Sequence, residues 1–164
     1  MKKYLSLVVC LVIVNGGVFC QEVKKMKITE VADYIKKSDH PMVVAFWATW
    51  CGPCVEEIPW LQEGVKKFAD KKIELVLVSL DFPRDYPSKV NAAVKEKKFN
   101  ATIFWLDETR ADYFCPKIDT AWDGSIPSSL YINNKTGYRR FFNRQLTDRQ
   151  VEPELKEMLS EPGF

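Results

Sequence analysis

Short apolar runs alternate with amphipathic segments along most of the chain. Two runs rich in β-branched residues, 42–47 and 73–79, have the length and composition of strands that are buried in a parallel sheet. The first is followed by apolar residues at helical spacing over 54–70, and the second by a helical pattern over 88–98. The order strand, helix, strand, helix predicts βαβ units and hence an α/β protein.

The pattern continues with shorter elements towards the C-terminus. Residues 129–132 and 138–142 predict two strands of a hairpin, because an Asn-Asn-Lys-Thr-Gly turn separates them. An amphipathic helix over 147–159 is expected to cover the sheet. The remaining expected elements are a helix over 29–37, a strand over 102–106 and a helix over 109–118. There is no internal repeat or low-complexity stretch, so we expect one domain.

The first twenty residues have a different pattern. Two lysines precede the apolar run 5–14, and small and polar residues follow it, which is the order of a secretory signal. The run is shorter than the roughly 20 apolar residues that a membrane-spanning helix needs. We expect a cleaved signal peptide over 1–20, a domain over 21–164, and a periplasmic or secreted protein. A lipid anchor on Cys20 is the alternative.

Composition and charge narrow the possible functions. The 164 residues are 46% hydrophobic, which excludes a disordered chain. Removal of residues 1–20 takes away two lysines and no acidic residue, and this leaves basic and acidic residues equal at 22. Nucleic-acid binding would favour a basic domain, so no nucleic-acid partner is expected. As a separate expectation, we take the protein to act as a monomer.

Three of the five cysteines lie beyond the expected signal peptide, namely Cys51, Cys54 and Cys115. An odd number is not a framework of paired structural disulfides. A zinc site would need four ligands, and the chain adds only one histidine, His40, so we expect no metal. Cys115 has no partner at a useful spacing. A buried, unreactive thiol is therefore expected there, and a regulatory or intermolecular thiol is the alternative.

Cys51 and Cys54 lie where the strand 42–47 passes into the helix 54–70. A cysteine at a helix N-terminus faces free backbone N–H groups and the positive end of the helix dipole, which favour its thiolate. The spacing of three places both sulfurs on one side of the first turn, and Pro53 suits a helix start. An outer nucleophile, Cys51, and an inner resolving thiol, Cys54, would form a dithiol redox site.

The sequence of residues 46–54, Phe-Trp-Ala-Thr-Trp-Cys-Gly-Pro-Cys, closely resembles the active-site segment of thioredoxins. Residues 125–132 resemble the segment of that family that carries a cis-proline beside the redox pair. The resemblance implies a thioredoxin fold, a central mixed β-sheet flanked by helices, here with an N-terminal extension and a central αβ insertion within 82–106. It also implies a cis peptide bond before Pro127 and substrate contacts from Trp50, Gly52, Pro53, Ile126 and Pro127.

Two positions indicate a subgroup of that family. Cytoplasmic thioredoxins have a buried Asp where this chain has Ala45, and Glu57 stands three residues after Cys54. This arrangement resembles extracytoplasmic TlpA/ResA-type thiol-disulfide oxidoreductases, which carry a Glu near the active thiols. Glu57 would take the proton from Cys54. The alternative is a solvated helix carboxylate, as we expect for Glu56.

The resemblance implies a thiol-disulfide oxidoreductase with no bound cofactor. The Gly52-Pro53 dipeptide matches reducing thioredoxins. It therefore favours the reduction of disulfides in extracytoplasmic proteins, such as the haem-binding cysteines of apocytochrome c, with a membrane electron donor for re-reduction. A disulfide oxidase or isomerase, a thioredoxin-fold peroxidase and a non-catalytic binding module on the same fold are the alternatives.

Overall fold

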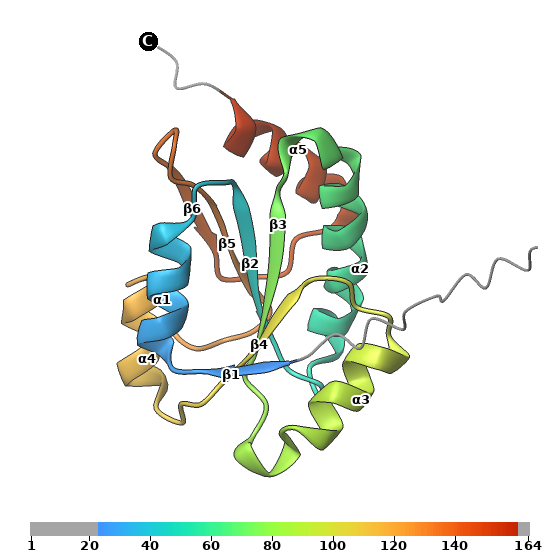
Figure 1. Ribbon diagram of the computed structural model, residues 1–164, viewed down its shortest axis with the longest axis vertical. Helices are drawn as coiled ribbons and strands as arrows, with labels where there is room; N and C mark the ends of the chain where they lie inside the picture. Colours follow the sequence, from blue (N-terminus) through green and yellow to red (C-terminus); the bar gives the residue numbers. More distant parts are fainter. Residues whose placement is uncertain (1–22, 161–164) are drawn as a thin grey trace, which may run out of the picture.

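The computed structural model describes residues 23–160, which form a six-stranded mixed sheet between two layers of helices (Figure 1). The expected signal peptide over 1–20, and Cys20 with it, lie outside these residues. The strands are β1 (Lys24–Met26), β2 (Met42–Trp47), β3 (Glu74–Ser79), β4 (Thr102–Leu106), β5 (Ser128–Asn133) and β6 (Tyr138–Phe142). The helices are α1 (Ile28–Lys37), α2 (Gly52–Lys67), α3 (Ser88–Glu96), α4 (Ala111–Ile118) and α5 (Asp148–Leu159).

The strand order across the sheet is β1-β4-β3-β2-β5-β6. The first four of these strands are parallel, whereas β5 runs antiparallel to β2 and β6 antiparallel to β5. Helix α3 and strand β4 form the expected central insertion, and β4 lies between β3 and β1. The structure thus confirms the mixed sheet flanked by helices.

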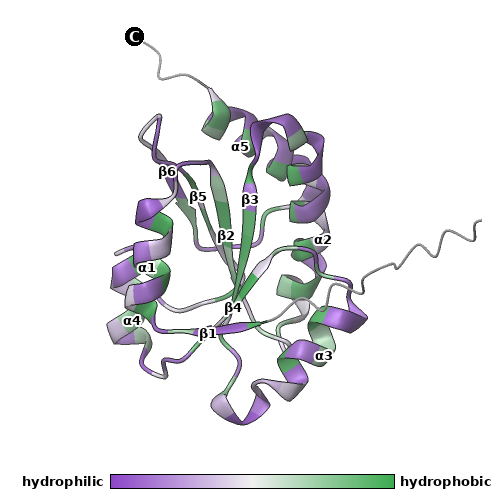
Figure 2. Cartoon of the chain, in the orientation of Figure 1, coloured by the Kyte–Doolittle hydropathy of each residue, from purple (hydrophilic) through white to green (hydrophobic). Residues whose placement is uncertain are grey.

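Helices cover both faces of the sheet, and their apolar sides point inward (Figures 1 and 2). Helices α2, α3 and α5 contribute buried side chains to the core on one face, and α1 and α4 to the core on the other. Strands β2 and β5 are buried along their whole length. This double coverage explains why the run 42–47 is continuously apolar and does not alternate with polar residues.

Gly64 sets the distance between α2 and α5. A Cβ atom at this position would lie 2.5 Å from Cγ1 of Val151, far inside van der Waals contact. The two helices can approach this closely only because residue 64 has no side chain. Their packing closes the core on the face of the sheet that carries the two cysteines of the C-x-x-C motif.

All the expected helices and strands are present, several of them with shifted ends. Strands 42–47, 102–106 and 138–142 agree with the structure. The helix expected over 54–70 begins at Gly52, because Cys51 is its N-cap, and ends at Lys67 before a short 3-10 turn. Strand β1 was not expected from the sequence. Within residues 23–160, no helix is long and apolar enough to cross a membrane.

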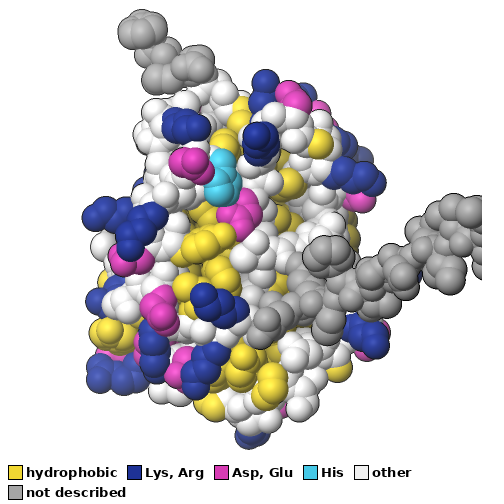
Figure 3. Space-filling model, in the orientation of Figure 1, with side chains coloured by type: hydrophobic (Ala, Val, Ile, Leu, Met, Phe, Trp, Pro, Cys, Tyr) yellow, Lys and Arg dark blue, Asp and Glu magenta, His cyan; other side chains and the backbone are white. Residues whose placement is uncertain are grey.

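Charges of both signs are interspersed over the face of the molecule in Figure 3. The single histidine, His40, lies between two carboxylates, with Nδ1 2.9 Å from Asp39 and Nε2 2.8 Å from Glu74. These contacts raise the pKa of His40, the Asp39 hydrogen bond contributing most. His40 thus belongs to a surface ion-pair group on the loop before β2.

Candidate active site around the Cys51–Cys54 disulfide

Cys51 and Cys54 form a disulfide at the N-terminus of α2, with an S–S distance of 1.97 Å and a Cα–Cα distance of 5.3 Å. Cys51 is the N-cap residue, and its Sγ accepts a hydrogen bond from the backbone N–H of Cys54 at 3.3 Å. Both residues are buried, Cys51 at 6% and Cys54 at 1% exposure. Cys54 is thus the more buried of the two cysteines, as expected, although Cys51 also presents little surface in the oxidised state.

The surroundings of the Cys51 sulfur suit a thiolate. When the disulfide is reduced, negative charge on Cys51 Sγ would lie at the positive end of the α2 dipole, next to the N–H of Cys54. Both interactions favour the charged form over the neutral thiol. Cys54 lies inside the first turn and lacks this position. The two sulfurs therefore differ in position, because only that of Cys51 lies at the helix N-terminus, where a thiolate is favoured.

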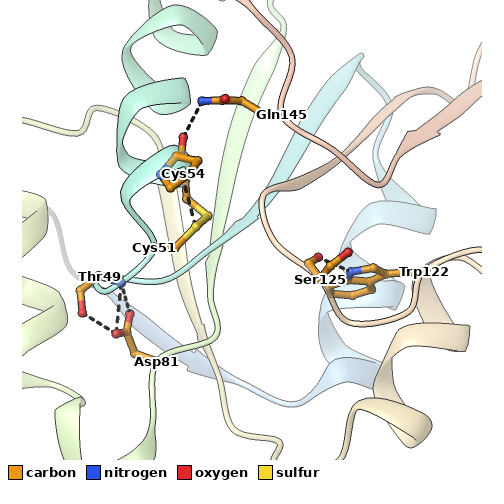
Figure 4. The surroundings of a disulfide bond; sticks show 8 residues. Thr49, Cys51, Cys54, Asp81, Trp122, Ser125 and Gln145 are labelled. Atoms are coloured by element: carbon orange, nitrogen blue, oxygen red, sulfur yellow. Dashed lines mark hydrogen bonds between the residues drawn. A yellow bond between two sulfur atoms is a disulfide. The ribbon is translucent and has the colours of Figure 1, made fainter.

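Asp81 anchors the loop that leads to Cys51 (Figure 4). Its buried carboxylate accepts hydrogen bonds from the backbone N–H of Thr49 at 3.0 and 3.1 Å and from Thr49 Oγ1 at 2.5 Å. Ser79 Oγ donates to the same carboxylate at 2.8 Å, and Trp105 Nε1 donates to the Asp81 carbonyl at 2.8 Å. Sequence reasoning did not assign Asp81 to the site. The available signal was an acidic residue two positions after the end of a buried parallel strand.

Gln145, which the sequence also did not indicate, anchors the other side of the motif. Its Nε2 donates to the carbonyl of Pro53 at 2.9 Å, within the first turn of α2 (Figure 4). Gln145 lies in the segment between β6 and α5. The cysteines are thus held between contacts from two distant parts of the chain.

Glu57 lies one turn beyond Cys54 and is buried, with 2% exposure. Its Oε1 accepts a hydrogen bond from the backbone N–H of Leu146 at 2.7 Å. Burial raises the pKa of Glu57 to about 7, while the Leu146 hydrogen bond and the Arg144 charge oppose the increase. Glu57 is therefore not a solvated carboxylate, unlike the exposed Glu56. A carboxyl group that exchanges its proton near neutral pH has the property that a proton acceptor needs.

The peptide bond between Ile126 and Pro127 is cis, as the sequence predicted. Strand β5 starts at the next residue, Ser128, which pairs with Phe46 on the strand that leads to the cysteines. Ile126 also packs against the core cluster that contains both cysteines. The loop before Pro127 is held by Trp122, whose Nε1 donates to the Ser125 carbonyl at 2.9 Å. A second cis bond, Tyr86–Pro87, was not expected.

The expected substrate-contacting residues gather at this end of the sheet. Trp50, Gly52 and Pro53 are exposed on one side of the disulfide, and Ile126 and Pro127 are half-buried in the loop before β5. A Cβ atom at Gly52 would meet no atom within 4 Å, so the backbone next to Cys51 is open to another chain. The structure places all five residues at the same end of the sheet, and their contacts with substrate stay a prediction.

Cys115 is buried at 2% exposure within the core on the α1 and α4 side of the sheet. Burial, with a smaller contribution from the Asp123 charge, raises the pKa of its thiol to about 11. A thiol that stays protonated is a poor nucleophile. The burial expected for Cys115 is confirmed, and its lack of reactivity stays a prediction. In residues 23–160, no group of three or more His, Cys, Asp and Glu is arranged to hold a metal ion.

A C-x-x-C disulfide at a helix N-terminus and a cis-proline at the same end of a mixed sheet define a thioredoxin-fold protein of the thiol-disulfide oxidoreductase class. The chain belongs to the AhpC/TSA family, whose sequence model matches residues 18–115.

The chain is similar to curated thioredoxins over limited segments. It is 36% identical over 67 residues to thioredoxin Y, chloroplastic, of Oryza sativa subsp. japonica, which covers 41% of this chain and 39% of the rice protein. It is 45% identical over 40 residues to the thiol-disulfide oxidoreductase ResA of Oceanobacillus iheyensis, covering 24% of this chain and 21% of that protein. The matches thus span less than half of these relatives.

Solved structures share the fold over most of the chain. The thiol:disulfide interchange protein of Chlorobium tepidum has a TM-score of 0.60 at 19% identity and covers 79% of this chain and 85% of its own. The thioredoxin-related protein of Neisseria meningitidis has a TM-score of 0.61 at 21% identity, with coverages of 74% and 86%. StoA of Bacillus subtilis has a TM-score of 0.53 at 20% identity, with coverages of 73% and 84%.

Proposed function

We propose that this protein reduces disulfide bonds in extracytoplasmic proteins. The observation that carries the proposal is the asymmetric Cys51–Cys54 pair, in which the Cys51 sulfur lies at the N-terminus of α2 and the buried Glu57 follows Cys54 by one turn. Cys51, Cys54 and Glu57 are the proposed catalytic residues. Trp50, Gly52, Pro53, Ile126 and Pro127 are the proposed substrate contacts.

The reaction begins with the reduced protein. The Cys51 thiolate attacks one sulfur of the substrate disulfide, that S–S bond breaks, and the other substrate sulfur leaves as a thiolate. Glu57 accepts the proton of Cys54, whose thiolate then attacks Cys51 Sγ and releases the second substrate sulfur. Two electrons have passed to the substrate, and the protein holds the Cys51–Cys54 disulfide. A dithiol donor reverses this step and restores the reduced protein.

The direction of exchange follows from the reduction potential of the pair. The Gly52-Pro53 dipeptide favours a reducing potential near the −270 mV of thioredoxin, and not the value of about −120 mV of a strong oxidant. The protein would then need a membrane electron donor at the cell surface. Disulfides of apocytochrome c are one suitable substrate class, because their cysteines must be reduced before haem attachment.

The proposed compartment rests on the sequence of the first twenty residues and on relatives. A signal peptide over 1–20 would deliver a domain of residues 21–164, acting as a monomer, to the periplasm or the medium. Similarity in fold to a secreted Mycobacterium tuberculosis disulfide oxidoreductase, with a TM-score of 0.55 at 16% identity, supports this location.

Insulin reduction with dithiothreitol as the donor tests the function. Cys51→Ser is expected to abolish turnover, and Cys54→Ser to accumulate a mixed disulfide through Cys51. Cys115→Ala, a change at the buried third cysteine, is the matched control and should retain turnover. Lack of turnover in the parent protein would favour a binding module, and turnover of hydrogen peroxide alone would favour a peroxidase. Equilibration with a dithiothreitol series measures the potential, and a value above about −150 mV would overturn the reductase assignment.

A further inference from the structure

Two of the most exposed aromatic side chains of the described residues lie together beside the disulfide. Trp50, directly before Cys51, is 53% exposed, and Phe82, directly after Asp81, is 52% exposed. Their rings stack with centroids 6.1 Å apart and an interplanar angle of 22°. Large aromatic surfaces normally leave water when they pack, so an exposed stacked pair next to a reactive centre indicates a surface for a partner.

A positive charge completes this surface. The Arg84 guanidinium carbon lies 5.0 Å from the centroid of the Phe82 ring, within cation–π distance. Arg84 forms no ion pair with any residue of the range 23–160, whereas its neighbour Asp85 pairs with Lys89 at 3.6 Å. The guanidinium therefore has hydrogen-bond donors available for an incoming carboxylate.

The surface is held in place by the same contacts that anchor the active-site loop. Asp81 binds Thr49, and this places Trp50 and Phe82, one residue further along each segment, next to each other. The chain after Phe82 turns through the 3-10 helix Pro83–Asp85, where the Asp85 N–H donates to the Phe82 carbonyl at 2.8 Å. The aromatic pair is thus presented by an ordered turn next to the disulfide.

We propose that Trp50, Phe82 and Arg84 form a specificity subsite for the substrate segment beside the reacting cysteine, a segment with one apolar and one acidic side chain. The apolar side chain lies on the Trp50–Phe82 pair, and the acidic side chain pairs with Arg84. This inference rests on the proposed function, because the occupant is a polypeptide that carries the disulfide to be reduced. Continuity of the surface with the disulfide favours this occupant over an unrelated partner.

Three disulfide-linked peptides of equal length provide the test. One carries Leu and Glu beside its cysteine, the second Leu and Lys, and the third Ser and Glu, and the rate measured is kcat/KM for reduction. The Leu–Glu peptide should be reduced fastest. Cystine is the reference substrate, because it reaches Cys51 without extending over the aromatic pair.

Variants separate the two parts of the subsite. Phe82→Ala should lower kcat/KM for both Leu peptides by about twofold to tenfold, the effect of one lost aromatic contact, and leave cystine reduction unchanged. The parent should reduce the Leu–Glu peptide with a kcat/KM about twofold to fivefold higher than that of the Leu–Lys peptide. Arg84→Glu should reverse this preference by a similar factor, and high salt should weaken the reversed preference. A folding defect cannot produce such an inversion.

The chain offers a matched control pair on the other face of the sheet. Tyr113 on α4 is exposed, and the Lys117 amine lies 4.7 Å from its ring centroid, so the pair repeats the chemistry of Phe82 and Arg84 away from the disulfide. Tyr113→Ala and Lys117→Glu should change none of the rates. The subsite is overturned if the three peptides are reduced equally, if Arg84→Glu leaves the preference unchanged, or if Phe82→Ala slows cystine as much as peptide. A parent protein that reduces neither cystine nor insulin contradicts the proposed function itself.

Discussion

Glu57→Gln should remove a pH dependence from the stability of the oxidised protein. The Glu57 carboxyl is buried, and burial raises its pKa from 4.5 to about 7. Between these two values the folded protein holds a proton that the unfolded chain has lost. Stability therefore falls as the pH rises through this window, because the unfolded state binds fewer protons. Gln is nearly the same shape and can still accept the Leu146 N–H, but it does not titrate.

The magnitude follows from the difference between 4.5 and about 7. Each pKa unit corresponds to about 1.4 kcal/mol, so ionisation of buried Glu57 costs about 3 kcal/mol of unfolding free energy above pH 7. Domains of this size have a stability of about 5 to 15 kcal/mol, so the effect is a large fraction of the total. The difference in unfolding free energy, variant minus parent, should rise by about 3 kcal/mol between pH 4 and pH 8.5.

Urea unfolding followed by tryptophan fluorescence across this pH range measures the difference. The oxidised protein is used because Cys51 and Cys54 do not titrate while they are bonded. Glu56→Gln removes one negative charge from an exposed site on the same helix and serves as the matched control. Other titrating groups contribute equally to parent and variant and cancel. A difference between Glu57→Gln and the parent that stays constant with pH would refute burial as the cause of the raised pKa.

Three further changes test the packing and the anchors of the site. Gly64→Ala should lower the unfolding free energy by about 1 to 3 kcal/mol, measured with denaturant, because the new methyl group overlaps the adjacent α5 side chain. Asp81→Asn weakens the charge-assisted bonds to Thr49 and should lower stability by about 1.5 to 3 kcal/mol. It should also alter the pH dependence of Cys51 alkylation; an unchanged profile would contradict a positioning role. Tyr131→Phe should leave the melting temperature unchanged or raise it slightly, since the buried hydroxyl has no partner within residues 23–160.

The longer apolar and amphipathic runs predict the helices and strands of the fold correctly. The run 42–47 predicts a buried strand because all its positions are apolar. The structure explains this pattern, since helices cover both faces of the sheet and every position of the strand is buried. Strand β1 left no comparable pattern. It has three residues, of which Lys24 and Lys25 are exposed, and it forms only by pairing with β4, far along the chain. No periodicity can be read from three residues.

The site could be predicted where local geometry defines it. The spacing of Cys51 and Cys54 at a helix start was enough to pair them, because one turn of helix brings them together. The contact between Asp81 and Thr49 depends instead on the register of two strands. Trp47 pairs with Ser79, so the residues two positions beyond each meet at the carboxyl edge of the sheet. That register is set by the whole sheet and cannot be read from either segment.

Two adjacent residues, Gln145 and Leu146, connect the proposed proton acceptor Glu57 to the backbone of the first turn of α2. Gln145 and Leu146 are adjacent: one donates to the Pro53 carbonyl, and the other donates its N–H to the Glu57 carboxylate. A hydrogen bond to an ionised carboxylate is stronger than one to a neutral group, so ionisation of Glu57 should hold Leu146 more tightly. Because Gln145 moves with Leu146, the turn that carries Cys51 and Cys54 should be held more firmly when Glu57 is charged. We therefore expect the protonation of Glu57 and the position of the disulfide to be coupled through Gln145 and Leu146.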